Sequence, residues 1–146
     1  MNVAVVIAVG SGHRMGQDIP KQFINVYDKP VLIYTLEGFQ KHPQIDAIEL
    51  VCIDGWHDVA WAYAKQFGIN KLKWIISGGN TGQESIRNGI FNLKDKCSED
   101  DIIIIHDGIS GHINQISFMC KPVNHCRHKH HEYPSGQNGI RQCDIH

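Results

Sequence analysis

The alternation of apolar strands with amphipathic segments most constrains what this chain can fold into. Four short runs rich in β-branched residues lie at 2–8, 47–53, 73–76 and 102–105. Helical periodicity is expected between them, over 30–43, 58–67 and 81–93, with Asp58 as the N-cap of the second helix. No tight Asn-Gly or Asp-Gly hairpin joins the strands, so the pattern predicts right-handed βαβ crossovers. The expected fold class is α/β, a Rossmann-like, mainly parallel sheet flanked by helices.

Polar and glycine-rich clusters follow three of these strands. They occupy residues 10–21, 78–85 and 106–107. Ligands of open α/β sheets bind beyond the carboxyl ends of the strands. Three such clusters at one edge of the sheet therefore predict a single ligand site.

The first cluster combines a flexible loop with two cations. Gly10, Ser11 and Gly12 lie beside Arg14 and Lys21. Glycines allow backbone N–H groups to turn toward an anion, and the cations add fixed positive charge. Phosphoryl and nucleotidyl transfer depend mainly on positioning and on neutralising phosphate charge, which suits this set of residues.

Two other glycine-rich motifs fit less well. A P-loop ends in Gly-Lys-Ser/Thr, whereas Gly16 is followed by Gln17 and Asp18. In a dinucleotide fingerprint the third glycine comes one position earlier, and an acidic residue follows about 20 residues on. The candidate for that acid, Asp54, lies much further along the chain. An NAD- or FAD-binding domain therefore remains an alternative, as does a flexible connection with incidental charges.

The segment IAVGSGHRM at residues 7–15, followed by Pro20-Lys21-Gln22, resembles the signature of the nucleotide-diphospho-sugar transferase superfamily. It is most similar to the cytidylyltransferases that act on methylerythritol 4-phosphate or ribitol 5-phosphate. The resemblance implies transfer of CMP from CTP to a polyol phosphate, with Mg²⁺ as cofactor and release of pyrophosphate. It implies catalytic roles for Arg14 and Lys21 and places the following residues around the nucleotide: Ala8, Val9, Gly10, Ser11 and Gly12.

One residue in this loop departs from the family pattern. Val9 stands where the family usually has alanine or glycine. A β-branched residue resists positive φ and crowds a tight loop, so we expect weaker nucleotide binding.

The second cluster, residues 78–89, places two glycines before a helix start. Such a turn is expected to offer free backbone N–H groups. It resembles the family segment that recognises cytosine and ribose, which implies that Gly79, Asn80 and Ser85 contact the base. Gly82 replaces the usual family arginine. The alternative is an ordinary strand-to-helix turn with Ser85 in the first helical turns.

The third cluster is His106-Asp107-Gly108. An aspartate at the end of a strand can hold magnesium or a ribose hydroxyl, and Asp107 is the predicted metal ligand. The similar family motif continues with Arg-Pro, whereas this chain has Ser110-Gly111. A His-Asp pair by itself is more typical of a hydrogen-bonded pair than of a catalytic dyad.

The composition changes after residue 109. Residues 110–146 hold six of the ten histidines and three of the five cysteines, without apolar periodicity. We therefore expect a nucleotide-binding part over 1–109 and a disordered His/Cys-rich tail over 110–146. A zinc-binding tail is the alternative, although the spacing is irregular. Its candidate ligands are Cys120, Cys126, His128, His130, His131, Cys143 and His146.

The resemblance ends inside a motif, and an altered reading frame or damaged gene would explain that. The later strands, the polyol-phosphate site and the dimerising arm of the family have no counterpart, whereas full-length members are expected to be homodimers. A non-catalytic nucleotide-binding remnant is therefore an alternative to an active enzyme. The truncated sheet is expected to end in an unpaired edge strand.

The net charge and the hydropathy pattern limit which binding partners and which cellular compartment are expected. The formal net charge of −1 gives no basic field for nucleic acid or an anionic membrane. The longest apolar run, residues 3–9, is too short to cross a bilayer, and no signal peptide is visible. An odd number of cysteines without disulfide spacing indicates reduced thiols, so we expect a cytoplasmic protein that binds CTP and a polyol phosphate.

Overall fold

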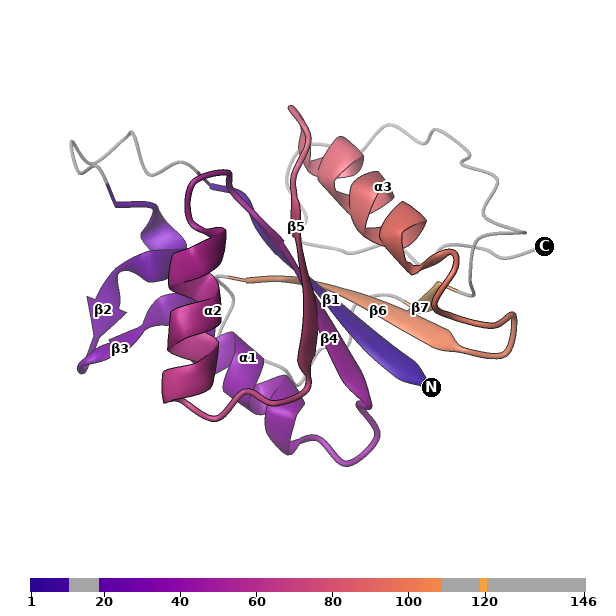
Figure 1. The fold of residues 1–146 in the computed structure, drawn as a ribbon, viewed down its shortest axis with the longest axis horizontal. Coiled ribbons are helices and arrows are strands. Elements are labelled where there is room, and N and C mark those ends of the chain that lie inside the picture. The colour runs from indigo at the N-terminus through magenta and orange to yellow at the C-terminus, as the bar shows by residue number, and fades with distance from the viewer. Residues whose placement is uncertain (11–18, 109–118, 121–146) are drawn as a thin grey trace, which may run out of the picture.

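The computed structural model describes residues 1–10, 19–108 and 119–120, and its centre is a five-stranded sheet (Figure 1). The sheet order is β5-β4-β1-β6-β7, and every pair except β6–β7 is parallel. The predicted α/β, mainly parallel architecture is confirmed. The strands are β1 (Asn2–Ala8), β4 (Ala47–Cys52), β5 (Leu72–Ser77), β6 (Ile102–Asp107) and β7 (Met119–Cys120).

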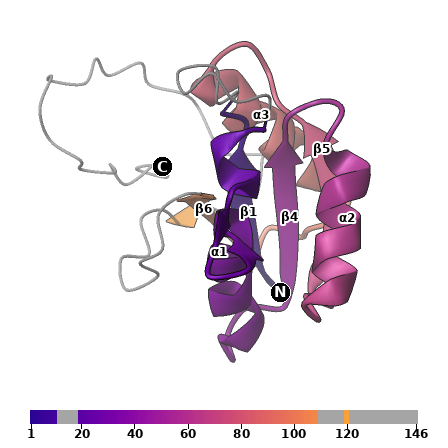
Figure 2. The same ribbon diagram turned by 90° about the vertical axis from the view of Figure 1, so that its left-hand side faces the viewer.

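Three helices cover the two faces of the sheet (Figures 1 and 2). They are α1 (Val31–Lys41), α2 (His57–Gln66) and α3 (Gly82–Leu93). We call the side covered by α1 and α2 the α1–α2 face, and the opposite side the α3 face. Alternate residues of β1 serve the two cores: Ala4 and Val6 belong to the α1–α2 face, and Val3 and Val5 to the α3 face.

A small hairpin precedes α1 and was not expected. Its strands, β2 (Asn25–Val26) and β3 (Lys29–Pro30), pair antiparallel. The two residues between them, Tyr27 and Asp28, have φ of 52° and 64°. Positive φ at both central positions is typical of a type I′ turn. The prediction that no Asn-Gly or Asp-Gly hairpin joins the strands of the main sheet is not contradicted, because this hairpin has Tyr-Asp at its turn and forms a separate two-stranded sheet.

The starts of two helices differ in their caps. Trp56, not Asp58, occupies the N-cap position of α2, and no side chain caps that end. The predicted cap is therefore wrong: Asp58 lies in the first turn and is exposed. At α3, the Thr81 hydroxyl accepts a hydrogen bond of 3.1 Å from the Glu84 backbone N–H.

The edge of the sheet beyond β6 is partly paired. Ile103 and Ile104 of β6 pair with Cys120 and Met119 of β7. The expectation of an unpaired edge is thus wrong at these positions, whereas the expectation of a disordered tail stays a prediction. The rest of the tail, including the other candidate zinc ligands, lies outside the described residues. Within the described part of the chain, no helix is long and apolar enough to cross a membrane.

The α3 face contains a buried carboxyl group. Glu49, in the middle of β4, is fully buried, and its Oε2 accepts a hydrogen bond of 3.2 Å from Asn92 of α3. A Cβ on Gly89 would lie 2.9 Å from Glu49 Oε1, so the glycine allows α3 to approach the sheet closely. Desolvation raises the pKa of Glu49 to about 7.

Candidate functional site

The carboxyl ends of the parallel strands are level with one another. Ala8 pairs with Cys52, Cys52 with Ser77, and Ile7 with Asp107. These ends lie toward the upper edge of the sheet in Figure 2. The predicted convergence of strand ends is therefore present, and the residues that follow β1, β5 and β6 share one edge.

The end of β1 packs directly against the turn between β5 and α3. A Cβ on Gly78 would lie 2.4 Å from Val9 Cγ1 and 2.9 Å from Ser85 Oγ, so this contact requires glycine. Val9 does not have positive φ; among the described non-glycine residues only Tyr27 and Asp28 do. Val9 therefore does not adopt the positive φ that a β-branched residue resists, and the expected weaker nucleotide binding stays a prediction. Its side chain packs instead with the core of the α3 face.

Side chains of α3 hold the turn that precedes it. The Gly79 N–H donates to Ser85 Oγ over 3.1 Å, and the Asn80 N–H donates to the Glu84 carboxylate over 2.7 Å. The Thr81 hydroxyl accepts from the Glu84 N–H, whereas the Glu84 carboxylate bonds the residue before the N-cap and not the Thr81 N–H that a capping box would use. The predicted free N–H groups are therefore wrong for Gly79 and Asn80, because both are already bonded. The side chain of Asn80 is exposed in this turn.

Ser85 supports this turn from beneath. It is fully buried, and its hydroxyl also donates to the Thr81 carbonyl over 3.0 Å. One oxygen thus connects Gly79 to the first turn of α3. A direct contact between Ser85 and a base remains a prediction.

Lys21 lies at the same edge, in a 3-10 turn of residues Lys21–Phe23. Its side chain is exposed, whereas Pro20 and Gln22 on either side are buried. Gln22 Nε2 donates to the Ala8 carbonyl over 2.9 Å, which joins the turn to the end of β1. Sequence reasoning placed Gln22 in a motif but gave it no role. Arg14, Ser11 and Gly12 lie outside the described residues, while Ala8 is buried and Gly10 is exposed.

His106 and Asp107 point in different directions. His106 is buried against Phe39 of α1, with ring centroids 5.2 Å apart, and its Nδ1 lies 2.7 Å from the Asp107 carbonyl oxygen. Asp107 is exposed at the end of β6. His106 is thus part of the packing, and the carboxylate of Asp107 is the group presented at the edge. No group of three or more metal-ligating side chains occurs in the described part of the chain.

Asp54 is the acidic residue that a dinucleotide site would need. It follows β4 and accepts a hydrogen bond from the Ser77 hydroxyl at the end of β5. His57 Nε2 lies 3.9 Å from the same carboxylate. The carboxylate of Asp54 is therefore held toward β5, on the other side of β4 from β1.

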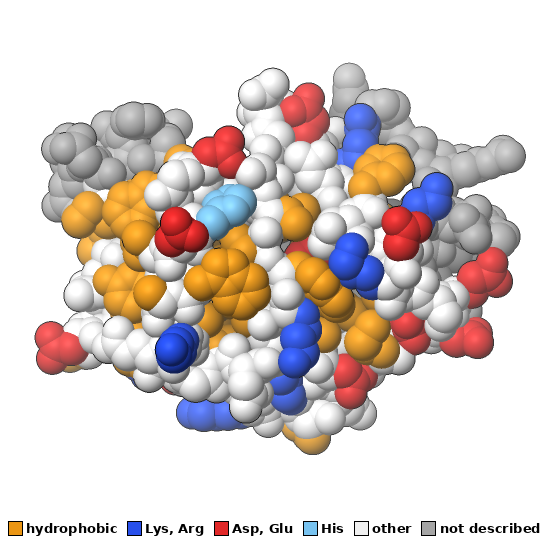
Figure 3. Space-filling model, in the orientation of Figure 1, with side chains coloured by type: hydrophobic (Ala, Val, Ile, Leu, Met, Phe, Trp, Pro, Cys, Tyr) orange, Lys and Arg blue, Asp and Glu red, His pale blue; other side chains and the backbone are white. Residues whose placement is uncertain are grey.

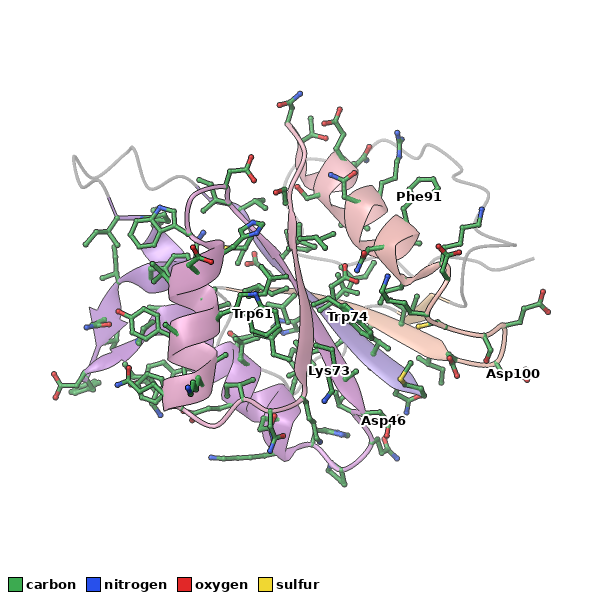
Figure 4. The ribbon with its side chains drawn as sticks, in the orientation of Figure 1. Asp46, Trp61, Lys73, Trp74, Phe91 and Asp100 are labelled. Carbon is green, nitrogen blue, oxygen red and sulfur yellow. The ribbon has the colours of Figure 1, made fainter. Side chains whose placement is uncertain are left out.

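A shallow apolar hollow lies elsewhere on the molecule. It is lined by Trp61, Ala64, Lys65, Gly68, Ile69 and Asn70, from α2 and the loop before β5. Figure 4 shows Trp61 and Trp74 on the face where Figure 3 shows hydrophobic side chains gathered. This hollow is at the amino end of β5, so it is separate from the candidate site.

Comparisons with known proteins agree with this geometry. Residues 2–127 match the sequence model of the 2-C-methyl-D-erythritol 4-phosphate cytidylyltransferase family. A ribitol-5-phosphate cytidylyltransferase of Lacticaseibacillus paracasei is 56% identical over 109 residues, covering 75% of this chain and 47% of the relative. A 2-C-methyl-D-erythritol 4-phosphate cytidylyltransferase of Clostridium tetani is 41% identical over 107 residues, covering 73% of this chain and 42% of the relative.

A solved structure shares the fold. The crystal structure of the 2-C-methyl-D-erythritol 4-phosphate cytidylyltransferase of Francisella tularensis has a TM-score of 0.57 and 28% identity, covering 80% of this chain and 49% of that one. The chain spans about half the length of the relatives that it matches. The family match extends to residue 127, and the domain boundary at residue 109 remains a prediction.

Proposed function

This chain belongs to the 2-C-methyl-D-erythritol 4-phosphate cytidylyltransferase family, and from that premise we propose that it forms the nucleotide-binding part of a cytidylyltransferase. The reaction is transfer of CMP from CTP to a polyol phosphate. The observation that carries the proposal is the contact of Val9 with Gly78, which joins the end of β1 to the β5–α3 turn. A ligand at this edge meets both a loop suited to phosphates and a turn suited to a base.

The chemistry requires charge neutralisation at the triphosphate. A phosphate oxygen of the acceptor attacks the α-phosphorus of CTP, a new P–O bond forms, and the bond to pyrophosphate breaks. Lys21, exposed beside the end of β1, supplies an ammonium group for the phosphate oxygens. Arg14, from the glycine-rich loop, is the proposed second cation, with Gly10, Ser11 and Gly12 around the phosphates.

The β5–α3 turn is the proposed base-binding element. Cytosine presents an amino donor and ring acceptors, which backbone carbonyls and an amide side chain can match. In this proposal the exposed Asn80 side chain and the backbone at Gly79 make these contacts. Ser85 acts from below, since its hydroxyl holds the Gly79 N–H.

Magnesium is the proposed cofactor. Mg²⁺ is commonly bound by one or two carboxylates together with substrate phosphates, so a single acidic ligand from the protein is sufficient. The exposed Asp107, in register with Ile7 of β1, fits that requirement. When bound, the ion would neutralise charge on the phosphate oxygens.

Ribitol 5-phosphate is the acceptor that the relatives favour. Ribitol-5-phosphate cytidylyltransferases reach 56% and 45% identity, and 2-C-methyl-D-erythritol 4-phosphate cytidylyltransferases reach 41% and 36%. 2-C-methyl-D-erythritol 4-phosphate is the second candidate.

Pyrophosphate release tests the proposal directly. CTP and Mg²⁺ are offered with each polyol phosphate in turn, and release is expected with ribitol 5-phosphate. Lys21→Ala and Arg14→Ala should abolish it, whereas Lys65→Ala, at the apolar hollow, should not. CTP binding in calorimetry without turnover would indicate a nucleotide-binding remnant, and binding of NAD or FAD instead of CTP would refute the proposal. Sedimentation of the same sample tests the expected homodimer.

A further inference from the structure

Gln22 is a buried amide with one satisfied end and one unsatisfied end. The residue is fully buried, and its Nε2 donates to the Ala8 carbonyl over 2.9 Å. Within the described part of the chain, its Oε1 is buried without a hydrogen-bond partner. A Cβ on Gly10 would lie 3.5 Å from that oxygen, so the amide is packed at the start of the glycine-rich loop. Buried unsatisfied polar groups in native proteins call for an explanation.

Stability of the fold does not explain this residue. The Ala8 carbonyl also accepts a hydrogen bond of 3.3 Å from the Ile53 N–H, so it stays bonded without Gln22. The unpartnered Oε1 opposes the gain from the Nε2 bond, because burying an unsatisfied acceptor is unfavourable. An apolar side chain of similar shape would make no hydrogen bond to Ala8, but it would also bury no unpartnered oxygen. The two effects on the free energy of unfolding therefore offset each other.

The buried amide of Gln22 is explained by the position that it gives to the neighbouring cation, Lys21. Lys21 is exposed in the turn that Gln22 fastens to the end of β1. On the other side of the turn, Phe23 stacks on Trp56 at the start of α2, with ring centroids 4.9 Å apart. The aromatic contact attaches the turn to α2, and the amide bond attaches it to the strand that leads into Gly10.

We propose that Gln22 is a positioning residue that holds Lys21 at the exit of β1, where its ammonium group meets the phosphate chain of the nucleotide. The identity of the ligand rests on the proposed function, whereas the fixing of the turn by Gln22 does not. Each part therefore has its own measurement.

Gln22→Met in the full chain tests both parts, because methionine keeps the shape and removes the amide. Calorimetry with CTP and Mg²⁺ should show affinity about tenfold weaker, the factor that corresponds to the loss of one hydrogen bond's free energy. Hydrogen exchange should become faster at the Phe23 and Ile24 amides, because the turn that holds them is no longer bonded to the end of β1. These amides donate to the Pro20 and Lys21 carbonyls within the turn. The midpoint of urea unfolding should not move.

Gln40→Met is the matched control. Gln40 Oε1 accepts from the Lys71 N–H over 2.9 Å, and its Nε2 donates to Asn70, far from the carboxyl edge. This substitution leaves the Lys71 amide without its side-chain acceptor, so we expect a lower unfolding midpoint and unchanged CTP affinity.

The outcomes separate the two proposals. If the unaltered chain does not bind CTP, the proposed function is wrong. The positioning role of Gln22 is then tested by amide exchange alone. Unchanged exchange at Phe23 and Ile24 in Gln22→Met would overturn the positioning role in either case. A lowered unfolding midpoint with unchanged exchange would likewise overturn it, by showing that Gln22 only supports the fold.

Discussion

The two faces of the sheet are built differently. The α1–α2 face holds most of the fully buried large apolar side chains, including Leu32, Leu36 and Phe39. The α3 face buries Glu49, and among the described residues no other acidic side chain is buried to that degree. The helix on that face also begins with the turn that we assign to the base. One face is thus packed mainly by apolar side chains, while the other, whose helix begins at the proposed base-side turn, also buries a carboxyl group.

Leu36→Ala should have the largest effect, because it removes packing from the α1–α2 face. The side chain is 1% exposed, and leucine-to-alanine changes in cores cost about 4 kcal/mol. We expect urea unfolding to show this loss in the free energy of unfolding equally at pH 5 and pH 8.5. A loss that varied strongly with pH would contradict the assignment of the titrating contact to the other face.

Glu49→Gln should have the next largest effect, and it should depend on pH. The folded-state pKa of Glu49 lies above its ordinary value near 4.5, so between 4.5 and about 7 the native state holds a proton that the unfolded state has lost. The unfolding free energy of the unaltered chain therefore falls as pH rises through this interval. Glutamine does not titrate, so the variant lacks this pH dependence. Its free energy of unfolding should exceed that of the unaltered chain by almost nothing at pH 4.5 and by about 3 kcal/mol at pH 8.5.

Glu37→Gln is the control for the pH effect. Glu37 lies on α1, and its carboxylate lies 2.7 Å from the Lys29 ammonium group, with both side chains partly exposed. Ion pairs that stay in contact with water contribute little, so we expect a change of about 1 kcal/mol in the free energy of unfolding. If the effect of Glu49→Gln on the free energy of unfolding is the same at pH 4.5 and pH 8.5, the pKa of Glu49 is not raised in the folded state.

The sequence was informative where a local period or a strand end decides the structure. The four parallel strands and the three polar clusters follow from apolar runs and from the geometry of parallel sheets. Contacts between segments that lie far apart in the sequence could not be predicted from it. Glu49 looks like any strand residue until Gly89 and Asn92 are packed above it, and Val9 looks strained until Gly78 makes room for it. Such environments depend on tertiary packing, for which a single sequence carries no periodic signal.

Thr81→Ala tests whether the cap of α3 supports the base-side turn. The hydroxyl accepts from the Glu84 N–H, and loss of such a cap costs about 1 kcal/mol. CTP affinity should fall as well, because Glu84 also holds the Asn80 N–H. Thr81→Ser keeps the hydroxyl, so it should restore the free energy of unfolding, measured with urea, and the CTP affinity, measured by calorimetry. A loss of stability with unchanged CTP affinity would separate the cap from the proposed site.

Asp58→Ala should have the smallest effect and completes the comparison of the two faces. Asp58 lies in the first turn of α2 but makes no capping hydrogen bond, so its contribution is limited to the favourable interaction of a negative charge with the helix dipole. That interaction amounts to about 0.5 kcal/mol when the group is exposed, and salt screens it. Urea unfolding should therefore show a small loss that shrinks at high ionic strength, with CTP affinity unchanged. A loss as large as that of Thr81→Ala, and insensitive to salt, would mean that Asp58 caps α2 in solution and that the two helices begin alike.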